Sequence, residues 1–499
     1  MWARMERAGR RFGALAATAV LALALRLICG VGFANYDTLY ALVWGGQLAR
    51  GQTPAYAVPV APTPHPLVEL LGLVLYPLGP RTVEDVAVAL GFAALAGCGW
   101  AIYRLGERWF SRLAGTLAAL IFLTRAPVLS DGVRAYIDLP YLLAVLAALL
   151  VESRRPRAGA PVLWLLALAG LLRPEAWVFS AIYWLYLADA LGRLRERRAG
   201  RRADVAALAG TAPARLSYRR LAGLAAIAAS GPLIWILSDL AITGDALWSL
   251  THTQHDAETL HRATGIAKVP LYIPKRIGEI LRVPVLIGAA VGGVLSLAWL
   301  RGRALPGAVA GVLAVLVFAV FASFGLPINT RYAFLAAAIL CVFCGAGVFG
   351  WLELPPGDRR RRWWLAAGAL VALALIAYAP SSYEGDSREL RKLAPEQRIE
   401  DELVALVRSG AITLRCGPVG VPNHAPIPLL ALYLRTSPRN IVSPETGHIE
   451  RGVYVQAASR EVEQDYVLDK NDPHEHASVP PGFSEIAANR SWRIYRRCV

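Results

Sequence analysis

Acidic and arginine side chains that could move protons and bind anions stand beside long apolar stretches of the chain. Asp37 follows the first such stretch, and Asp138 directly precedes a later one. A carboxylate in apolar surroundings can accept a proton, and desolvation is expected to raise its pKa and make it a better base near neutral pH. Arg134 and Arg331 stand at similar positions, where a planar guanidinium group can bind phosphate oxygens. These residue types predict proton transfer next to an anionic group.

The composition indicates the surroundings of these residues. Of the 499 residues, 56% are hydrophobic and only 18% are charged, and the mean hydropathy is +0.44. One soluble core cannot bury that much apolar surface, so we expect a membrane protein. The net charge of +16 does not indicate a nucleic-acid partner, because the basic residues occur in short runs between apolar segments.

The basic runs and the apolar segments together predict an α-helical polytopic membrane protein. The runs are Arg4, Arg7, Arg10 and Arg11, then 154–157, 193–202, 215–220 and 359–362. The candidate crossings are 12–31, 84–104, 112–129, 138–152, 160–173, 176–191, 219–241, 283–300, 305–325, 331–351 and 363–380. These eleven crossings put every basic run on the cytoplasmic side, the N-terminus inside and the C-terminus outside. The first segment is interpreted as a retained span, not a cleaved signal peptide.

Two places in the sequence decide whether an odd or an even number of crossings precedes the later basic runs, and therefore on which side of the membrane those runs lie. Segment 66–79 is apolar but short and bounded by prolines, and a crossing there would put the later basic runs outside. We therefore predict a re-entrant or surface helix at the outer interface. Segments 160–173 and 176–191 are kept as two crossings for the same reason.

The C-terminal region, 381–499, is predicted to be a small extracytoplasmic α/β domain that follows a transmembrane domain, 1–380. Its pattern indicates helices at 388–408 and 427–434 and strands at 411–415 and 491–496. Cys416 and Cys498 would meet if the two strands pair, and in an oxidising compartment they are either bonded or free. The other four cysteines are interpreted as small apolar core residues.

The first outer loop, 32–83, carries short motifs in a definite order. It reads Asn35-Tyr36-Asp37-Thr38-Leu39-Tyr40, then Arg50-Gly51-Gln52-Thr53-Pro54-Ala55-Tyr56, then Pro64-His65-Pro66-Leu67, and its short helix ends in Leu78-Gly79. This order of acid, helix, turn and juxtamembrane helix resembles the membrane glycosyltransferases of the GT-C class. Within that class it is similar to the protein mannosyltransferase and aminoarabinose transferase superfamily, with a matching layout over roughly residues 12–350.

The resemblance implies roles for residues on the outer face. Asp37 would be the catalytic base and Asp138 a second catalytic acid, although Asp138 is equally explained as the cap of the helix that follows it. Arg331 is explained either as a membrane anchor or, by the resemblance, as a partner of a lipid phosphate. The residues predicted to contact substrate are Tyr36, His65, Arg134, Tyr136 and Arg331.

Two further polar groups have structural interpretations. Arg173 and Glu175 flank a proline at membrane depth or at the outer edge of the membrane. We expect them to form an ion pair, because an unpaired charge at the bilayer centre costs about 3 kcal/mol. Three histidines and two acids cluster between residues 251 and 261. Their spacing matches no metal-ligand motif, so no metal site is predicted. No cofactor is assigned, and the sequence leaves open whether the protein uses a divalent metal ion. Lys268, Lys275 and Arg276 follow this cluster, and an interpretation as ordinary surface charges explains them equally well.

The sequence thus predicts a glycosyltransferase of the cytoplasmic (inner) membrane. Its donor would be a polyprenyl-phosphate-linked sugar, and its acceptor a cell-envelope glycan, lipid or protein on the outer face. The C-terminal domain is expected to help choose the acceptor. The alternative is a transporter or flippase for a lipid-linked or anionic solute, which should show two related halves. No internal repeat is visible in the sequence.

Overall fold

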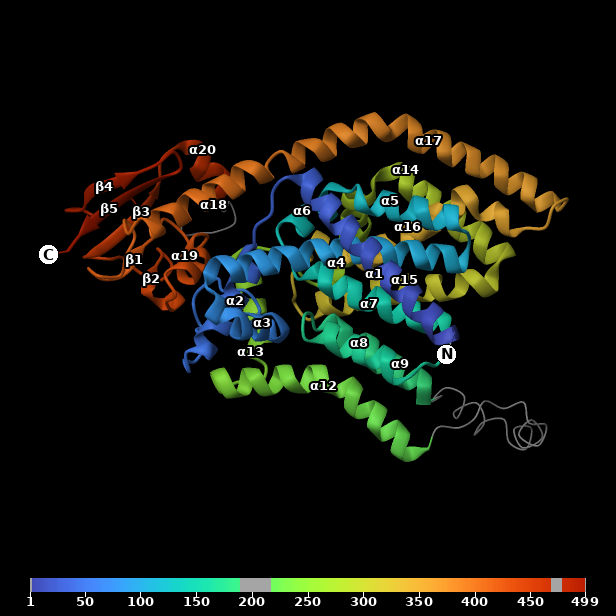
Figure 1. The fold of residues 1–499 in the computed structure, drawn as a ribbon, viewed down its shortest axis with the longest axis horizontal. Coiled ribbons are helices and arrows are strands. Elements are labelled where there is room, and N and C mark those ends of the chain that lie inside the picture. The colour runs from blue at the N-terminus through green and yellow to red at the C-terminus, as the bar shows by residue number, and fades with distance from the viewer. Residues whose placement is uncertain (1, 189–216, 468–477, 499) are drawn as a thin grey trace.

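The helices gather into an elongated bundle, and a small sheet lies at one end of it (Figure 1). The structure, a computed structural model, describes residues 2–188, 217–467 and 478–498. The helices before the first gap are α1 (Trp2–Cys29), α2 (Tyr36–Ala49), α3 (Pro66–Leu75), η1 (Tyr76–Leu78), α4 (Pro80–Trp109), α5 (Arg112–Leu123), α6 (Ala126–Val133), α7 (Asp138–Arg154), α8 (Ala160–Gly170) and α9 (Glu175–Ala188). The helices of the bundle after that gap are α12 (Tyr218–Thr243), α13 (Trp248–Thr259), η2 (Ile266–Lys268), α14 (Val269–Trp299), α15 (Arg301–Ser323), η3 (Thr330–Ala333), α16 (Phe334–Phe349), η4 (Gly350–Glu353) and α17 (Arg359–Leu390).

Each predicted crossing contains a helix in the described part of the chain. Six helical stretches are long and apolar enough to cross a membrane, and the pair α5 and α6, bent by 66°, makes seven if it forms one crossing. The six are Pro80–Trp109, Tyr218–Thr243, Ile266–Trp299, Arg301–Ser323, Thr330–Glu353 and Arg359–Arg408. Other expected crossings are shorter, such as α8 with 11 residues. The multi-pass membrane architecture is confirmed, and the count of eleven stays a prediction. The basic run 193–202 and residues 215–216 lie outside the described residues.

The segment predicted to be the first outer loop folds into two short helices, α2 and α3, that cross closely. An added Cβ on Gly45 would lie 2.1 Å from the backbone oxygen of Glu69, and one on Gly72 would lie 2.6 Å from that of Leu42. Neither position has room for a side chain, so the close crossing requires glycine on both helices. Helix α3 has 10 residues, which is too few to cross a membrane. The predicted short helix after Pro66 is therefore present.

The C-terminal region forms a five-stranded sheet with helices packed against it. Its strands are β1 (Val419–Gly420), β2 (Ile441–Val442), β3 (Gly452–Ala457), β4 (Ser484–Ala488) and β5 (Trp492–Arg497), and its helical elements are α18 (Leu393–Arg408), α19 (Ile427–Tyr433), η5 (Pro438–Asn440), α20 (Arg460–Val462) and η6 (Glu463–Val467). The order is β2-β1-β3-β5-β4, with β1 parallel to both of its neighbours and β5 antiparallel to both of its own. Leu403 of α18 and Leu430 of α19 are buried in one cluster with Trp492 and Ile494. The predicted α/β fold is confirmed.

The strand predicted at 411–415 is wrong. The backbone amides of Ala411 and Ile412 still bond to Leu406 at the end of α18, at 3.1 and 3.2 Å, so this segment continues the helix terminus and cannot join a ladder. β5 pairs instead with β3 and β4.

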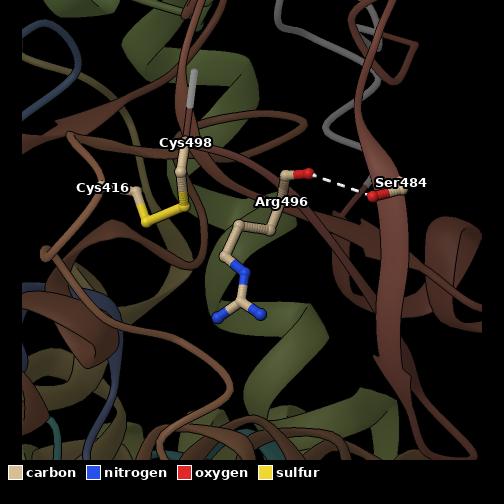
Figure 2. Close-up of a disulfide and its surroundings, with 4 residues drawn as sticks. All are labelled: Cys416, Ser484, Arg496 and Cys498. Atoms are coloured by element: carbon tan, nitrogen blue, oxygen red, sulfur yellow. Dashed lines mark hydrogen bonds between the residues drawn. A yellow bond between two sulfur atoms is a disulfide. The ribbon is translucent and has the colours of Figure 1, made fainter.

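Cys416 and Cys498 are nevertheless joined by a disulfide, shown in Figure 2, with their Cα atoms 4.9 Å apart. Both cysteines flank the start of β3: the amide of Val453 donates to Pro418, just after Cys416, at 3.2 Å, and Gly452 lies opposite Arg497. Figure 2 also shows the hydroxyl of Ser484 bonded to the backbone oxygen of Arg496 at 3.4 Å, which joins β4 to the same end of the sheet. The disulfide therefore joins the segment before β1 to the end of β5, although the predicted pairing of 411–415 with β5 is absent.

Hydrogen bonds hold the C-terminal domain against the bundle. The hydroxyl of Tyr433 in α19 donates to Glu84 of α4. The amide of Gly32, which follows α1, donates to Gln397 of α18 at 2.8 Å. The domain is thus in contact with the part of the chain that carries Asp37.

Removal of the disulfide is expected to destabilise the C-terminal domain. Cys416 and Cys498 are 82 residues apart in the sequence, and closing so long a loop stabilises a fold by about 2–4 kcal/mol. The double variant Cys416→Ser/Cys498→Ser should unfold at a lower temperature, measured by the fluorescence of its tryptophans during heating. A reducing agent should produce the same shift in the wild type and none in the variant. Equal unfolding temperatures in the absence of reductant would contradict the expectation.

Candidate functional site

A chain of carboxylates and guanidinium groups joins four segments that are distant in the sequence. Arg331 in η3 lies 2.9 Å from Asp37 in α2 and 3.8 Å from Asp138 at the start of α7. Arg173, between α8 and α9, binds Asp138 and donates from Nε to both oxygens of Glu175 at 3.2 Å. We call these five residues the charge network. With every member ionised, three negative charges face two positive ones.

Local capping fixes the position of Asp37. The side chain of Asn35 caps α2 by accepting hydrogen bonds from the amides of Asp37 and Thr38 at 2.8 and 3.2 Å. The amide of Asn35 itself donates to the backbone oxygen of Arg134 at 2.8 Å, and the Thr38 hydroxyl donates to Ala135 at 2.9 Å. The first loop is thus bonded to the second, so Asp37 lies where the two loops meet.

Asp138 pairs with cations instead of capping its helix. Its neighbour Ile137 is the N-cap of α7, and no side chain caps that helix end. The Asp138 side chain is only 3% exposed and lies between Arg173 and Arg331. The capping explanation for Asp138 is therefore not what the structure has, and a catalytic role stays a prediction.

Aromatic rings hold both arginines of the charge network in place. The guanidinium of Arg331 lies 4.8 Å from the ring centre of Tyr136, and that of Arg173 lies 4.0 Å from the ring centre of Tyr332. Such cation–π contacts stabilise a desolvated guanidinium by about 2 kcal/mol. The predicted ion pair of Arg173 with Glu175 is present, and it extends to Asp138.

The expectation of a raised pKa for Asp37 is wrong. Burial has the largest single effect and would raise the pKa of Asp37. The positive charge of Arg331, its hydrogen bond and smaller contributions from neighbours such as Arg262 together outweigh burial, so this pKa lies below its ordinary value. His65, the residue before α3, lies near the same charges, and burial lowers its pKa to about 4. Near neutral pH the site therefore holds an ionised Asp37 and a neutral His65.

Asp37 and Arg331 line a cavity of about 950 Å3 between the bundle and the C-terminal domain. Cationic side chains gather in its wall: Arg262, Lys268, Lys275, Arg276 and Arg331. Arg276 pairs with Glu279 at 3.0 Å. Within the described part of the chain, none of Arg262, Lys268 and Lys275 pairs with a carboxylate. The cavity is large enough for a small-molecule substrate and offers it unpaired positive charge.

The structure brings most of the predicted site residues together. Tyr36 and Tyr136 line the cavity, and the hydroxyl of Tyr36 donates to Val60 at 3.0 Å. Arg134 does not join them, because its side chain binds Glu396 of α18, with Nε donating to both carboxylate oxygens at 3.1 Å. Its backbone oxygen holds Asn35 and its side chain holds the C-terminal domain.

Sequence reasoning missed several residues of the cavity. Asp131 lines it with a buried carboxylate oxygen, Oδ2, that makes no hydrogen bond within the described residues. Asn423 and His424 reach it from the C-terminal domain. Lys275 had no signal beyond its charge, since only the fold shows which surface cations face a cavity. In the ranges that the structure describes, no three histidine, cysteine or acidic side chains are placed to hold a metal ion.

Neither a protein-family model nor a curated protein sequence matches the chain. Solved structures, in contrast, do match the chain. ArnT from Cupriavidus metallidurans, crystallised with undecaprenyl phosphate, has 14% identity and a TM-score of 0.52, covering 97% of this chain and 98% of its own. An oligosaccharyltransferase from Archaeoglobus fulgidus in its apo form has 11% identity and a TM-score of 0.50, covering 91% and 70%. Both are GT-C glycosyltransferases.

The chain has a GT-C fold. The match to ArnT runs over almost the whole of both chains, so the GT-C fold includes the C-terminal domain. The layout that the first-loop motifs of the sequence predicted is confirmed at the level of the fold.

The pH dependence of stability tests the lowered pKa of Asp37. This pKa is lower in the folded protein than in the unfolded chain, where it is about 3.9. The ion pair with Arg331 therefore stabilises the fold fully above that pH and loses its effect as the pH falls through the lower folded value. Asp37→Asn should reduce the free energy of unfolding by about 3 kcal/mol near neutral pH, with the difference from the wild type shrinking below about pH 4. Thermal unfolding across this pH range is the measurement, and a constant difference would refute the lowered pKa.

Proposed function

We propose that this chain is a membrane glycosyltransferase that moves a sugar from a polyprenyl-phosphate donor to an acceptor on the outer face of the cytoplasmic membrane. The observation that carries the proposal is the ion pair between Asp37 and Arg331 in the wall of a cationic cavity. The two residues are far apart in the sequence of the membrane domain. The GT-C fold favours a transferase over the transporter that the sequence also allowed. ArnT, which has this fold, was solved with undecaprenyl phosphate, and that ligand suggests the class of donor.

The proposed reaction is a displacement at the sugar C1. The acceptor oxygen forms a bond to C1 while the bond from C1 to the phosphate oxygen breaks, and the electron pair leaves with the polyprenyl phosphate. Asp37 is ionised near neutral pH, since its pKa is lowered, and it takes the proton of the acceptor. Asp138 is buried between the two arginines and acts as a positioning residue that orients Arg331.

The division of charge favours cavity-lining lysines as the partners of the leaving phosphate. In the charge network, Arg331 already faces Asp37 and Asp138, and the network as a whole carries one excess negative charge when ionised. This excess suits the positive charge that develops at C1 as the bond to phosphate breaks. The leaving phosphate gains negative charge in the same step and needs donors that are not already paired. Lys268 and Lys275 line the cavity without such partners within the described residues.

The proposed orientation puts the N-terminus in the cytoplasm and the C-terminal domain outside. The disulfide between Cys416 and Cys498 supports an outer location, because disulfides persist in oxidising compartments. The acceptor, a glycan, lipid or protein of the cell envelope, would enter below the C-terminal domain, which contributes Asn423 and His424 to the cavity wall.

Transfer by Asp37→Asn tests the role of Asp37 as the base. Loss of a general base typically lowers the rate by roughly 10²- to 10⁴-fold, and we expect a loss of this size at equal amounts of protein in the membrane. The assay measures passage of radiolabelled sugar from a polyprenyl-phosphate donor to extracted cell-envelope acceptors. The matched control is Asp85→Asn, because the Asp85 side chain on α4 is 58% exposed and lies outside the cavity. Wild-type activity in Asp37→Asn would overturn the assignment.

Lys275→Gln tests the phosphate-binding wall. Hydrogen bonds to charged groups contribute about 1.5–3 kcal/mol, so the KM for the donor should rise by about tenfold or more, with a smaller change in kcat. Lys392→Gln removes the same charge from an exposed site that pairs with Glu389 at 3.3 Å and serves as the control. A fall in kcat at an unchanged KM would contradict a role for Lys275 in binding the donor.

A further inference from the structure

The loop after β1 brings a carboxamide group into the wall of the cavity that Asp37 lines. Asn423 of this loop is only 4% exposed and lines the cavity. Its Oδ1 accepts a hydrogen bond from the backbone amide of Ala425 at 3.0 Å. Because a backbone amide can only donate, this bond fixes which way the carboxamide points, and Nδ2 lies on the other side. Nδ2 donates to no atom within the described residues, so this nearly buried side chain carries a donor without a partner.

The carboxyl edge of the small sheet faces the same cavity. β1 is parallel to β2 and to β3, so the segments that follow these three strands lie at one edge of the sheet. They supply His424 after β1, Glu445 after β2 and Tyr466 after β3, and both His424 and Tyr466 line the cavity. In α/β sheets, ligands bind outside the carboxyl ends of parallel strands. The C-terminal domain therefore meets the cavity with the edge at which a ligand is expected.

Two side chains hold the loop of Asn423 close to Asp37. Nδ1 of His424 lies 3.0 Å from Oε1 of Glu445, whose side chain is buried. The His424 ring packs edge-on against the ring of Tyr36, with the ring centres 5.6 Å apart. Tyr36 directly precedes Asp37, and Asn423 directly precedes His424. The unpartnered carboxamide and the proposed base are thus each one residue away from the same ring contact.

Negative charge exceeds positive charge where the C-terminal domain meets the first loop. Burial raises the pKa of Tyr36 most, and the charges of Glu445 and Asp37 raise it further. Asp256 of α13 adds a third carboxylate to the cavity wall. Arg262 acts on Asp37 and Asp256, and the arginine that binds Asp37 is shared within the charge network. An anionic group would be repelled at this place, whereas an uncharged hydroxyl group would not.

We propose that Asn423 is a specificity residue that donates a hydrogen bond from Nδ2 to an uncharged oxygen of the acceptor, a hydroxyl group of a neutral glycan. A donor that loses water on folding and gains no partner is costly, and a substrate oxygen supplies that partner. A site that is built to bind a substrate hydroxyl also rejects molecules that lack it. The bond would hold the acceptor beside Asp37, which takes its proton. This inference rests on the proposed function, because it takes the cavity to hold an acceptor, and it narrows that acceptor to a neutral glycan.

Asn423→Asp tests the proposal, because it keeps the oxygen that binds Ala425 and replaces the Nδ2 donor by an acceptor. Cell-envelope extract is separated by anion exchange into neutral and anionic glycans, and each fraction is offered with a radiolabelled polyprenyl-phosphate sugar. We expect the wild type to label the neutral fraction. In Asn423→Asp the amount of this fraction needed for half-maximal transfer should rise by about fivefold or more, with an unchanged KM for the donor. The matched control Asn440→Asp adds the same charge to an exposed residue of η5 outside the cavity lining.

The outcomes separate the failure of this inference from that of the proposed function. If the wild type transfers sugar to no component of the whole extract, the transferase itself is wrong. If transfer is confined to anionic glycans, or if Asn423→Asp uses the neutral fraction as well as the wild type, the role of Asn423 alone is refuted. A parallel rise in the KM for donor and acceptor would also refute it, since the residue would then not act on the acceptor alone. If Asn423→Asp fails to fold, Asn423→Ser decides, because its hydroxyl still accepts from Ala425 while the shorter side chain withdraws the donor from the cavity.

Discussion

The need to pair buried charges determines how the end of the bundle that carries Asp37 is built. A carboxylate at membrane depth is costly unless a cation lies beside it, and here Asp138 and Glu175 share Arg173 while Asp37 and Asp138 share Arg331. No single segment supplies both signs in the required geometry. The first loop, the start of α7, the junction of α8 with α9, and η3 must therefore meet. The ion pairs of the charge network hold these elements together. Substitution of one member by an uncharged residue would leave its partner as an unpaired buried charge.

The same pairing separates two electrostatic environments around one cavity. On the Asp37 side every arginine of the charge network is already matched, and the excess charge is negative. Elsewhere in the cavity lining, Lys268 and Lys275 have no carboxylate partner within the described residues. A reaction that develops positive charge at carbon and negative charge at phosphate needs this separation. It also explains why Arg331, the predicted phosphate partner, fits better as a partner of carboxylates.

Sequence patterns predicted the helices and the order of the motifs. They missed the contacts between segments that are far apart in the sequence. Helical apolar periods and the order of motifs around Asp37 were sufficient for the membrane class and the GT-C layout. Both Asp37 and Arg331 were singled out, but not their ion pair, because nothing local shows which loops touch. The same gap led to the wrong pKa for Asp37, since desolvation was weighed without the cation. The wrong strand at 411–415 has a local cause instead, because the amides of Ala411 and Ile412 still bond back to the end of α18.

Arg134 connects the loop that carries Asp37 to the C-terminal domain. Its backbone oxygen accepts the amide of Asn35, the residue that caps α2 and positions Asp37. Its side chain binds Glu396 at the start of α18. A shift of the C-terminal domain would therefore pull on the same residue that supports Asp37. Because Asn423 and His424 of that domain line the cavity, domain docking sets both the shape of the cavity and the position of its carboxylate. The C-terminal domain is in this sense part of the cavity that Asp37 lines.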